Sequence, residues 1–211
     1  MRIVRIFLGL AIVAIIVAGP YYFYQFRKAQ FRNFHVVKEG VLYRSGQMTQ
    51  DGFQRMVYDH SIKTVISLRF ASNPKDAPPD VFEEGLSRSM GMNHFRIPYR
   101  SWHSVHGSIP ADKGVNKFLK IMRDPANYPV LIHCFAGIHR TGAYCAIFRI
   151  EFDHWSNEQA MAEMKAYGYV MEHPDVFAYL QNYRPPSPSH AEPPLANPVV
   201  RPASHELEVE N

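Results

Sequence analysis

The sequence predicts an α/β protein with a central, mostly parallel sheet of four to five strands flanked by helices. Short apolar runs alternate along the chain with longer stretches whose apolar residues recur at helical spacing. The strand-like runs lie at 34–37, 41–45, 64–68, 93–97 and 130–133. The helical stretches lie at 49–58, 79–90, 110–122, 143–152, after residue 156 and at 174–183.

Capping residues and periodicity support individual elements. Thr49 is a suitable N-cap for the first of these helices, and Ser156 followed by Gln159 has the form of a capping box. The stretch 110–122 starts at a proline and presents apolar residues at helical spacing, namely Val115, Phe118, Leu119 and Met122. The apolar run at 130–133 indicates a short buried strand.

The N-terminal segment has no charged residue between positions 6 and 26. These 21 residues match the ~20 that a helix needs to cross a bilayer. Four aromatic residues at 21–24 would lie at one membrane interface. We therefore expect a transmembrane helix over 6–26 within a membrane anchor at 1–32. The alternative is a cleaved signal peptide with its apolar core at 6–18, which Pro20 disfavours because it follows the small residues at the core's end.

Basic residues flank this segment on both sides, with Arg2 and Arg5 before it and Arg27, Lys28 and Arg32 after it. A very short basic N-terminus usually stays in the cytoplasm. We therefore expect a single-pass membrane protein whose folded domain is extracytoplasmic, in a bacterial periplasm. The second basic cluster opposes this orientation.

The C-terminal segment 184–211 is rich in proline. It holds seven of the 16 prolines and few large apolar residues, so it cannot build a core and is expected to be disordered. One folded domain is thus expected at 33–183.

The positive charge of the chain is concentrated at its N-terminus. The net charge is +4, and residues 1–38 hold six basic side chains and no acidic one. The remainder therefore carries a net charge of −2 (+4 − 6). A nucleic-acid partner needs a cationic face on the folded domain, so none is expected.

Residues 133–142 read His-Cys-Phe-Ala-Gly-Ile-His-Arg-Thr-Gly, with five residues between Cys134 and Arg140. Such a segment can curl so that its backbone N–H groups surround an anion, helped by the flexible Gly137. Arg140 completes the ring because its planar fork binds two phosphate oxygens at once. The spacing predicts a catalytic loop whose phosphate-binding residues are Phe135, Ala136, Gly137, Ile138, His139 and Arg140.

Cys134 is the candidate nucleophile. A free thiol has a pKa of ~8.5, but helix N-termini and nearby cations lower it and favour the thiolate. The helix that follows the loop aims its positive end at the same hollow. Thr141 is expected to donate its hydroxyl to the sulfur and to help it leave in a second step. The chemistry calls for no metal and no other cofactor.

Other interpretations of the motif are weaker. Zinc binding would have to use His133, Cys134, His139 and Cys145, whose spacing matches no usual zinc site. A non-enzymatic phosphate-binding module would normally lack the cysteine or the arginine, and both are present. Cys145 is expected on an apolar helix face, where packing is its simplest role.

The loop resembles the signature of the cysteine-dependent protein tyrosine and dual-specificity phosphatases. The preceding buried strand, the following helix and the runs at 41–47 and 64–69 extend the resemblance to about residues 35–183. They are similar to the small, atypical dual-specificity phosphatases of bacteria, plants and fungi, and we expect the bacterial branch. The resemblance implies hydrolysis of phosphate monoesters through a phosphocysteine.

The chain departs from this family at the proton donor. These phosphatases usually carry an aspartic acid in the loop after the strand that precedes the catalytic one, and here that loop, residues 98–109, has no acid. His103 or His106 is a candidate because an imidazole is a competent acid near neutral pH. Asp112 is the alternative, although it is more simply a helix-start residue. We favour His103.

The substrate class follows from the charge of the loop. Relatives that act on inositol phosphates carry basic residues inside the loop, whereas this chain has Phe135, Ala136 and Ile138. This favours a phosphorylated protein, above all phosphotyrosine, or a small, lightly charged monoester. Inositol phosphates are the alternative, because Arg69, Arg100 and His103 could supply cations from neighbouring loops.

Overall fold

The computed structural model describes every residue except 1, 74, 100, 105, 171–172 and 186–211. Its centre is a five-stranded sheet in the order β1-β2-β5-β3-β4. The strands are β1 His35–Lys38, β2 Leu42–Ser45, β3 Thr64–Ser67, β4 Asn93–Arg96 and β5 Val130–His133. β1 runs antiparallel to β2, and the other neighbours are parallel. The predicted α/β fold with a mostly parallel sheet is confirmed.

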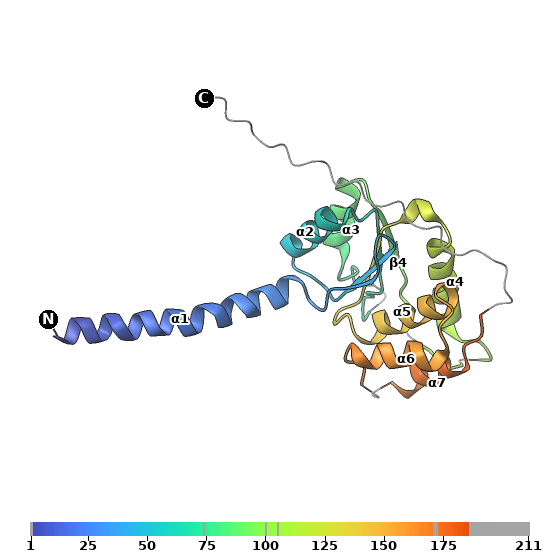
Figure 1. The fold of residues 1–211 in the computed structure, drawn as a ribbon. Coiled ribbons are helices and arrows are strands. Elements are labelled where there is room, and N and C mark those ends of the chain that lie inside the picture. Colours follow the sequence, from blue (N-terminus) through green and yellow to red (C-terminus); the bar gives the residue numbers. More distant parts are fainter. Residues whose placement is uncertain (1, 74, 100, 105, 171–172, 186–211) are drawn as a thin grey trace, which may run out of the picture.

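Helices cover both faces of this sheet (Figure 1). Those that pack against it or beside it are α2 Gln50–His60, α3 Val81–Ser89, α4 Pro110–Met122, α5 His139–Phe152, α6 Asn157–Ala166 and α7 Pro174–Asn182, with a short 3₁₀ helix at Pro125–Asn127. On one face, Tyr43, Val65 and Leu131 meet apolar residues of α2. On the other face, strand residues such as Leu42 and Ile132 meet α4 to α7.

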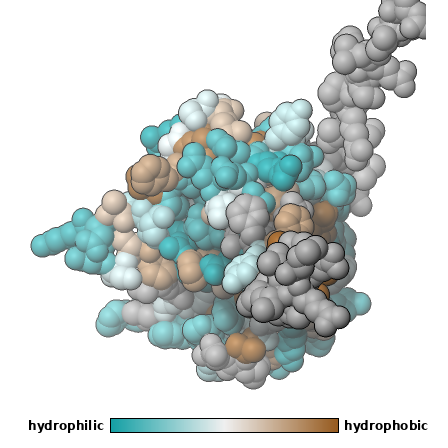
Figure 2. Space-filling view, turned by 90° about the vertical axis from the view of Figure 1, so that its left-hand side faces the viewer, coloured by the Kyte–Doolittle hydropathy of each residue, from teal (hydrophilic) through white to brown (hydrophobic). Residues whose placement is uncertain are grey.

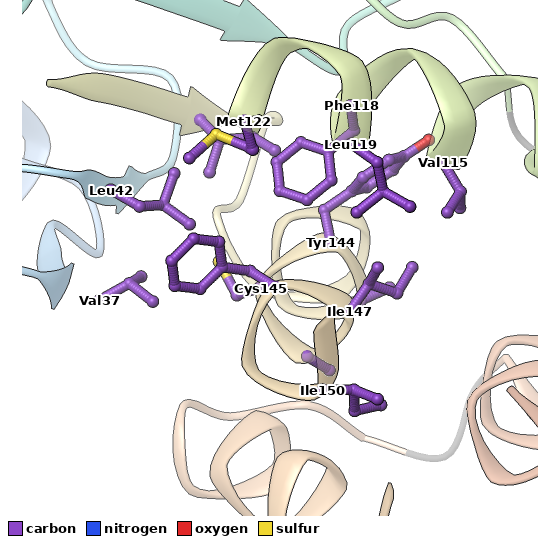
Figure 3. Packing of buried hydrophobic residues seen from close by; sticks show 14 of the residues in the cluster. Val37, Leu42, Val115, Phe118, Leu119, Met122, Tyr144, Cys145, Ile147 and Ile150 are labelled. Carbon is purple, nitrogen blue, oxygen red and sulfur yellow. The ribbon is translucent and has the colours of Figure 1, made fainter. Parts of the chain in front are cut away.

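The second face carries the larger core. Figure 3 shows side chains of α5 and α4 pointing toward one another, with Val37 and Leu42 of the sheet at one side. Cys145 lies inside this cluster at 1% exposure, and burial raises the pKa of its thiol to about 11. Its expected packing role agrees with this position.

The boundaries of the elements follow the sequence closely. The strand at 130–133 and the helix at 110–122 have the predicted limits, and the limits of the other strands differ by at most one residue. The largest shift is at α5, which begins at His139 rather than at position 143. The first residues of this helix belong to the phosphate-binding loop itself, where polar residues hid the helical pattern.

The N-terminal helix α1, Arg2–Gln30, extends away from the domain (Figure 1). Within the part of the chain that the structure describes, no helix is both long and apolar enough to cross a membrane. The membrane anchor predicted at 1–32, with its span at 6–26, is therefore unsupported. The expected extracytoplasmic location depended on this anchor and stays a prediction.

On the face that Figure 2 presents, hydrophilic residues cover much of the described surface, with hydrophobic ones in small groups between them.

The tail predicted to be disordered, 184–211, lies outside the described residues apart from its first two.

Candidate active site

The candidate nucleophile follows the central strand of the sheet. β5 lies between β2 and β3, and Cys134 comes directly after its last residue, His133. The loop then turns into α5, whose N-cap is Ile138. Ligands of open α/β sheets bind outside the carboxyl ends of the strands, and the N-terminus of a helix favours anions there. The topology thus places Cys134 at an anion-binding position.

Gly137 gives the loop its curvature. Its φ of +76° lies in the left-handed region, and a Cβ atom there would lie 2.3 Å from the backbone nitrogen of Gly46. Its N–H donates to Sγ of Cys134 at 3.2 Å. Its carbonyl accepts a hydrogen bond of 2.8 Å from Arg44, which is buried in β2. The buried arginine therefore fixes the loop from below and leaves its N–H groups facing inward.

The surroundings of Cys134 favour its thiolate. Burial, at 3% exposure, by itself raises the pKa of the thiol. The hydroxyl and N–H of Thr141, the charge of Arg140 and the N–H of Gly137 outweigh this effect, and the pKa is lowered overall. A thiolate is the reactive form of cysteine, so this environment suits a nucleophile. The roles of Cys134, Arg140 and Thr141 in catalysis stay predictions.

A buried network of charges lies behind the loop. Nε2 of His133 is 2.6 Å from Oε1 of Glu83 in α3, and Nε2 of His94 in β4 is 3.5 Å from the same oxygen. Burial alone would raise the pKa of Glu83, but the two histidines hold it at about 2. The carboxylate in turn outweighs burial at His133 and raises the pKa of that imidazole. The network therefore favours the protonated imidazole of His133, the residue next to Cys134.

Three members of this region could approach a metal ion. One ligand atom each from Asp80, Glu83 and His94 lies within 4.8 Å of the others. Asp80 is already paired with Arg96 at 3.0 Å, and Glu83 is paired with His133. These carboxylates thus have cationic partners within the chain, and the group fits an internal ion-pair network better than a metal centre.

The outer edge of the loop is held by residues that directly follow α1. Nδ2 of Asn33 donates to the carbonyl of Ala136 at 2.7 Å, and Arg32 donates to the carbonyl of Phe135 at 3.4 Å. The guanidinium of Arg32 also lies 4.5 Å from the centre of the Phe135 ring. These contacts were not predicted, because the sequence pattern assigned residue 32 to the flank of an anchor.

Cys134 and Arg140 open onto one hollow of about 410 Å³. Its other walls are Phe70, Trp102, Phe135, Ala136, His139, His173, Asp175 and Val176. Arg140 donates to the carbonyl of Leu68 and stacks on the ring of Phe70, with 4.7 Å between guanidinium and ring centre. The hollow combines one strong cation, a thiol nucleophile and aromatic walls.

Two of the three candidate proton donors, His103 and Asp112 but not His106, lie in a neighbouring hollow. His103 and Asp112 line it together with Trp102 and Asp175, the residues that it shares with the hollow of Cys134. Asp112 accepts a 2.8 Å hydrogen bond from Tyr179. His103 is 66% exposed, and its Nδ1 lies 3.5 Å from Oδ2 of Asp175. The structure thus brings the predicted loop residues together and leaves these two candidates beside them.

The comparisons agree with this site. A family model described as "DSP-PTPase phosphatase fused to NAD+ Kinase" matches residues 24–174. The chain therefore belongs to this family of dual-specificity-type protein tyrosine phosphatases, which are cysteine-dependent enzymes. The resemblance inferred from the loop is confirmed.

Individual relatives are more distant. OCA1 of Mycosarcoma maydis is 27% identical over 137 residues, which cover 64% of this chain and 79% of that protein. The inositol diphosphatase SIW14 of Saccharomyces cerevisiae is 27% identical over 137 residues, or 64% of this chain and 44% of that protein. The relatives include fungal and plant proteins, so the expected placement in a bacterial branch is unsupported.

Solved structures show the same fold. The core catalytic domain of SIW14, crystallised with citrate, has a TM-score of 0.55 and 25% identity, and the match covers 72% of this chain and 85% of that one. TpbA of P. aeruginosa, in complex with phosphotyrosine, has a TM-score of 0.56 and 20% identity over 72% of this chain and 84% of that one. The second likeness supports the fold alone.

Proposed function

We propose that the chain hydrolyses phosphate monoesters through a phosphocysteine intermediate. One observation supports this above all: Cys134 and Arg140 face the same hollow, and the contacts of the sulfur favour its thiolate. A thiolate beside a helix N-terminus and an arginine fork can attack a phosphorus atom whose oxygens those groups hold. Each step of the proposed reaction uses groups of the chain itself.

In the first step, the sulfur of Cys134 attacks phosphorus, and the bond from phosphorus to the leaving oxygen breaks. Arg140 and the loop N–H groups hold the other three phosphate oxygens, and their contacts tighten as charge develops in the transition state. In the second step, water attacks the phosphocysteine and the sulfur leaves as a thiolate. The hydroxyl of Thr141 and the N–H of Gly137 stabilise that leaving sulfur.

We propose an aromatic phosphate, above all phosphotyrosine, as the substrate class. The hollow is bounded by Phe70, Trp102, Phe135 and Val176, which suit a flat apolar ring more than a polyanion. His139 and His173 stand on the same wall, with 5.2 Å between their ring centres. A histidine side chain, unlike lysine or arginine, carries no permanent charge near neutral pH, so such a wall attracts a polyanion less strongly.

Inositol phosphates are the second candidate, and a specific contact favours them. The guanidinium groups of Arg32 and Arg69 lie 4.5 and 4.9 Å from the centre of the Phe135 ring at the edge of the loop. They would meet additional phosphates outside the catalytic one. The relative SIW14 is named an inositol diphosphatase, which supports the same alternative.

A substrate panel on the full chain tests both candidates. We expect phosphotyrosine peptide to be hydrolysed faster than phosphoserine peptide or inositol polyphosphates, because the walls of the hollow are apolar. Cys134→Ser should abolish turnover of every substrate, since the nucleophile is lost, and EDTA should change nothing. Turnover that survives Cys134→Ser would contradict the mechanism. Binding of phosphopeptide without turnover by the natural sequence would indicate a binding module instead.

A further inference from the structure

The hollow that contains Cys134 and Arg140 also contains a carboxyl group that the sequence pattern did not single out. Asp175, the second residue of α7, is the acidic side chain among the described residues that line it. Its side chain is 29% exposed, so it is half enclosed but reaches the open space. The residue lies far along the chain from the loop at 98–109, in which the family usually places its acid.

The helix that carries Asp175 is held in place from two sides. Pro174 precedes it at the first position of α7, and this helix packs against α5 and α6. On the same helix, the ring of Tyr179 packs edge-on against Trp102, with 5.0 Å between ring centres. Trp102 is 3% exposed and lines both hollows. A carboxyl group on a packed helix is better fixed than one on a loop.

The neighbours of Asp175 fit a group that exchanges protons. Its Oδ2 lies 3.5 Å from Nδ1 of His103, which faces the other hollow and solvent. Its charge is also near the hydroxyl of Tyr169, whose pKa is raised first by burial and then by this carboxylate. Asp112, by contrast, accepts a hydrogen bond from the hydroxyl of Tyr179 and lines the neighbouring hollow but not the hollow of Cys134.

We propose that Asp175 is the proton donor of the reaction and that His103 positions it. This rests on the proposed function. In the first step, the protonated carboxyl group gives its proton to the leaving oxygen as the bond from phosphorus to that oxygen breaks and the bond to sulfur forms. In the second step, the carboxylate takes a proton from the attacking water as the sulfur leaves. The enzyme then has its thiolate and its protonated carboxyl group again.

A bound substrate assists the first of these steps. The negative charge of the phosphate and of the thiolate favours the protonated form of a neighbouring carboxyl group. His103 at 66% exposure contacts solvent, so it can hold the carboxyl group in orientation and link it to bulk water. The first-turn position of an acid in a helix is common by itself. A first-turn position alone does not explain why Asp175 lies in the same hollow as the nucleophile.

The test is Asp175→Asn in the full chain, with two substrates that differ in their leaving group. Phenyl phosphate releases a basic oxygen that needs a proton, whereas 2,4-dinitrophenyl phosphate releases one that does not. We expect kcat/KM for phenyl phosphate, which reports the first step, to fall by about 10²-fold or more, in the range of general acid catalysis. The value of kcat/KM for the dinitrophenyl ester should stay within a few-fold of the natural sequence, whereas kcat falls for both esters because hydrolysis of the phosphocysteine loses its base.

Two variants serve as controls. Asp112→Asn makes the same chemical change in the neighbouring hollow and should slow both substrates little and equally. Asp175→Glu retains an acid and should recover part of the rate with phenyl phosphate, which also guards against a folding defect in Asp175→Asn. His103→Gln should give a smaller loss with the same dependence on the leaving group, because it acts through Asp175.

The outcomes separate this inference from the function on which it rests. A natural sequence that hydrolyses neither ester would overturn the proposed function and the inference with it. If the natural sequence is active and Cys134→Ser abolishes that activity, but Asp175→Asn lowers kcat/KM equally for both esters, the inference alone is overturned. A leaving-group effect in His103→Gln but not in Asp175→Asn would assign the proton to His103 instead.

Discussion

The two sides of the catalytic loop differ in how their charges are arranged. Behind the loop, Glu83 is shared by two buried histidines, and Asp80 and Arg96 continue the network. In front of it, Asp175 has His103 at 3.5 Å, and that histidine is largely exposed. The buried side holds charged groups that pair with one another away from water, whereas the open side lines the hollow that reaches solvent. We therefore expect the buried side to support the thiolate of Cys134 in addition to Thr141, Arg140 and Gly137, and the open side to meet the substrate.

Arg140 provides the largest effect with which to test this division, because it lines the open hollow and is the proposed phosphate ligand. Arg140→Lys retains the charge but loses the planar two-point contact, which tightens in the transition state. We expect kcat to fall by about 10²–10³-fold, as when a preorganised donor is removed. Steady-state kinetics with an aromatic phosphate measures this.

Arg123→Lys is the matched control, because Arg123 forms an exposed pair with Glu151 at 3.4 Å and does not line the hollow. It should leave kcat unchanged. If Arg140→Lys raised KM and left kcat intact, Arg140 would act in ground-state binding, and its assigned role in the transition state would be wrong.

Glu83→Gln tests the buried side. The variant removes the carboxylate that holds the proton on His133, so the positive charge beside Cys134 is lost more readily. The pKa of the Cys134 thiol should therefore rise, and the pH dependence of its alkylation by iodoacetamide should shift to higher pH. Glu84→Gln, one residue along α3 and paired with Arg96 and Arg88 nearer the surface, is the control and should leave the profile in place.

The same variant should change stability in a defined pH window. The pKa of Glu83 falls from 4.5 to about 2 on folding, so its contribution is complete above pH 4.5 and is lost as the pH drops toward 2. The pKa of His133 is raised above 6.5, so its contribution is complete below pH 6.5 and is lost as the pH rises. In Glu83→Gln, the free energy of unfolding should be lower by about 1.5–3 kcal/mol, since a buried hydrogen bond to a charged group is removed. This loss should be largest between pH 4.5 and pH 6.5, where both groups contribute fully. A loss that stays equally large as the pH falls to 2 would contradict the charged pair.

The sequence predicted the catalytic loop well because its chemistry is local. Cys134, Gly137 and Arg140 lie within seven positions, and backbone curvature alone brings them together. Glu83 and His133 are 50 positions apart, and only the parallel pairing of β3 with its neighbours brings α3 under the loop. The one indication of this network in the sequence is His133, a polar residue at the end of the otherwise apolar strand β5.

The open side was harder to predict for another reason. Asp175 follows a proline at a helix start, where an acid is explained by the helix itself. The resemblance places a proton donor in 98–109, and the sequence predicts none beyond the helix that follows it. Asn33, whose side chain supports the loop, directly follows the predicted membrane anchor, so the sequence gives it no role in the site.

The smallest effect concerns the edge that joins the two sides, where Arg32 meets Phe135. The carbonyl of Arg32 accepts a 2.7 Å hydrogen bond from the N–H of Gly46, so its backbone is fixed and a change of side chain should leave the fold intact. Arg32→Gln removes the cation that stacks on Phe135 and weakens one contact to the loop. With an aromatic monoester, we expect kcat/KM to change by less than about 5-fold, as for an exposed charge. With an inositol polyphosphate, the loss should be larger and should shrink as salt is added, because it removes an ionic contact. Lys38→Gln, which breaks the pair with Asp153 at 2.7 Å, is the matched loss of charge. If both variants lowered the rates of both substrates equally, Arg32 would act through general charge and not at a second phosphate position.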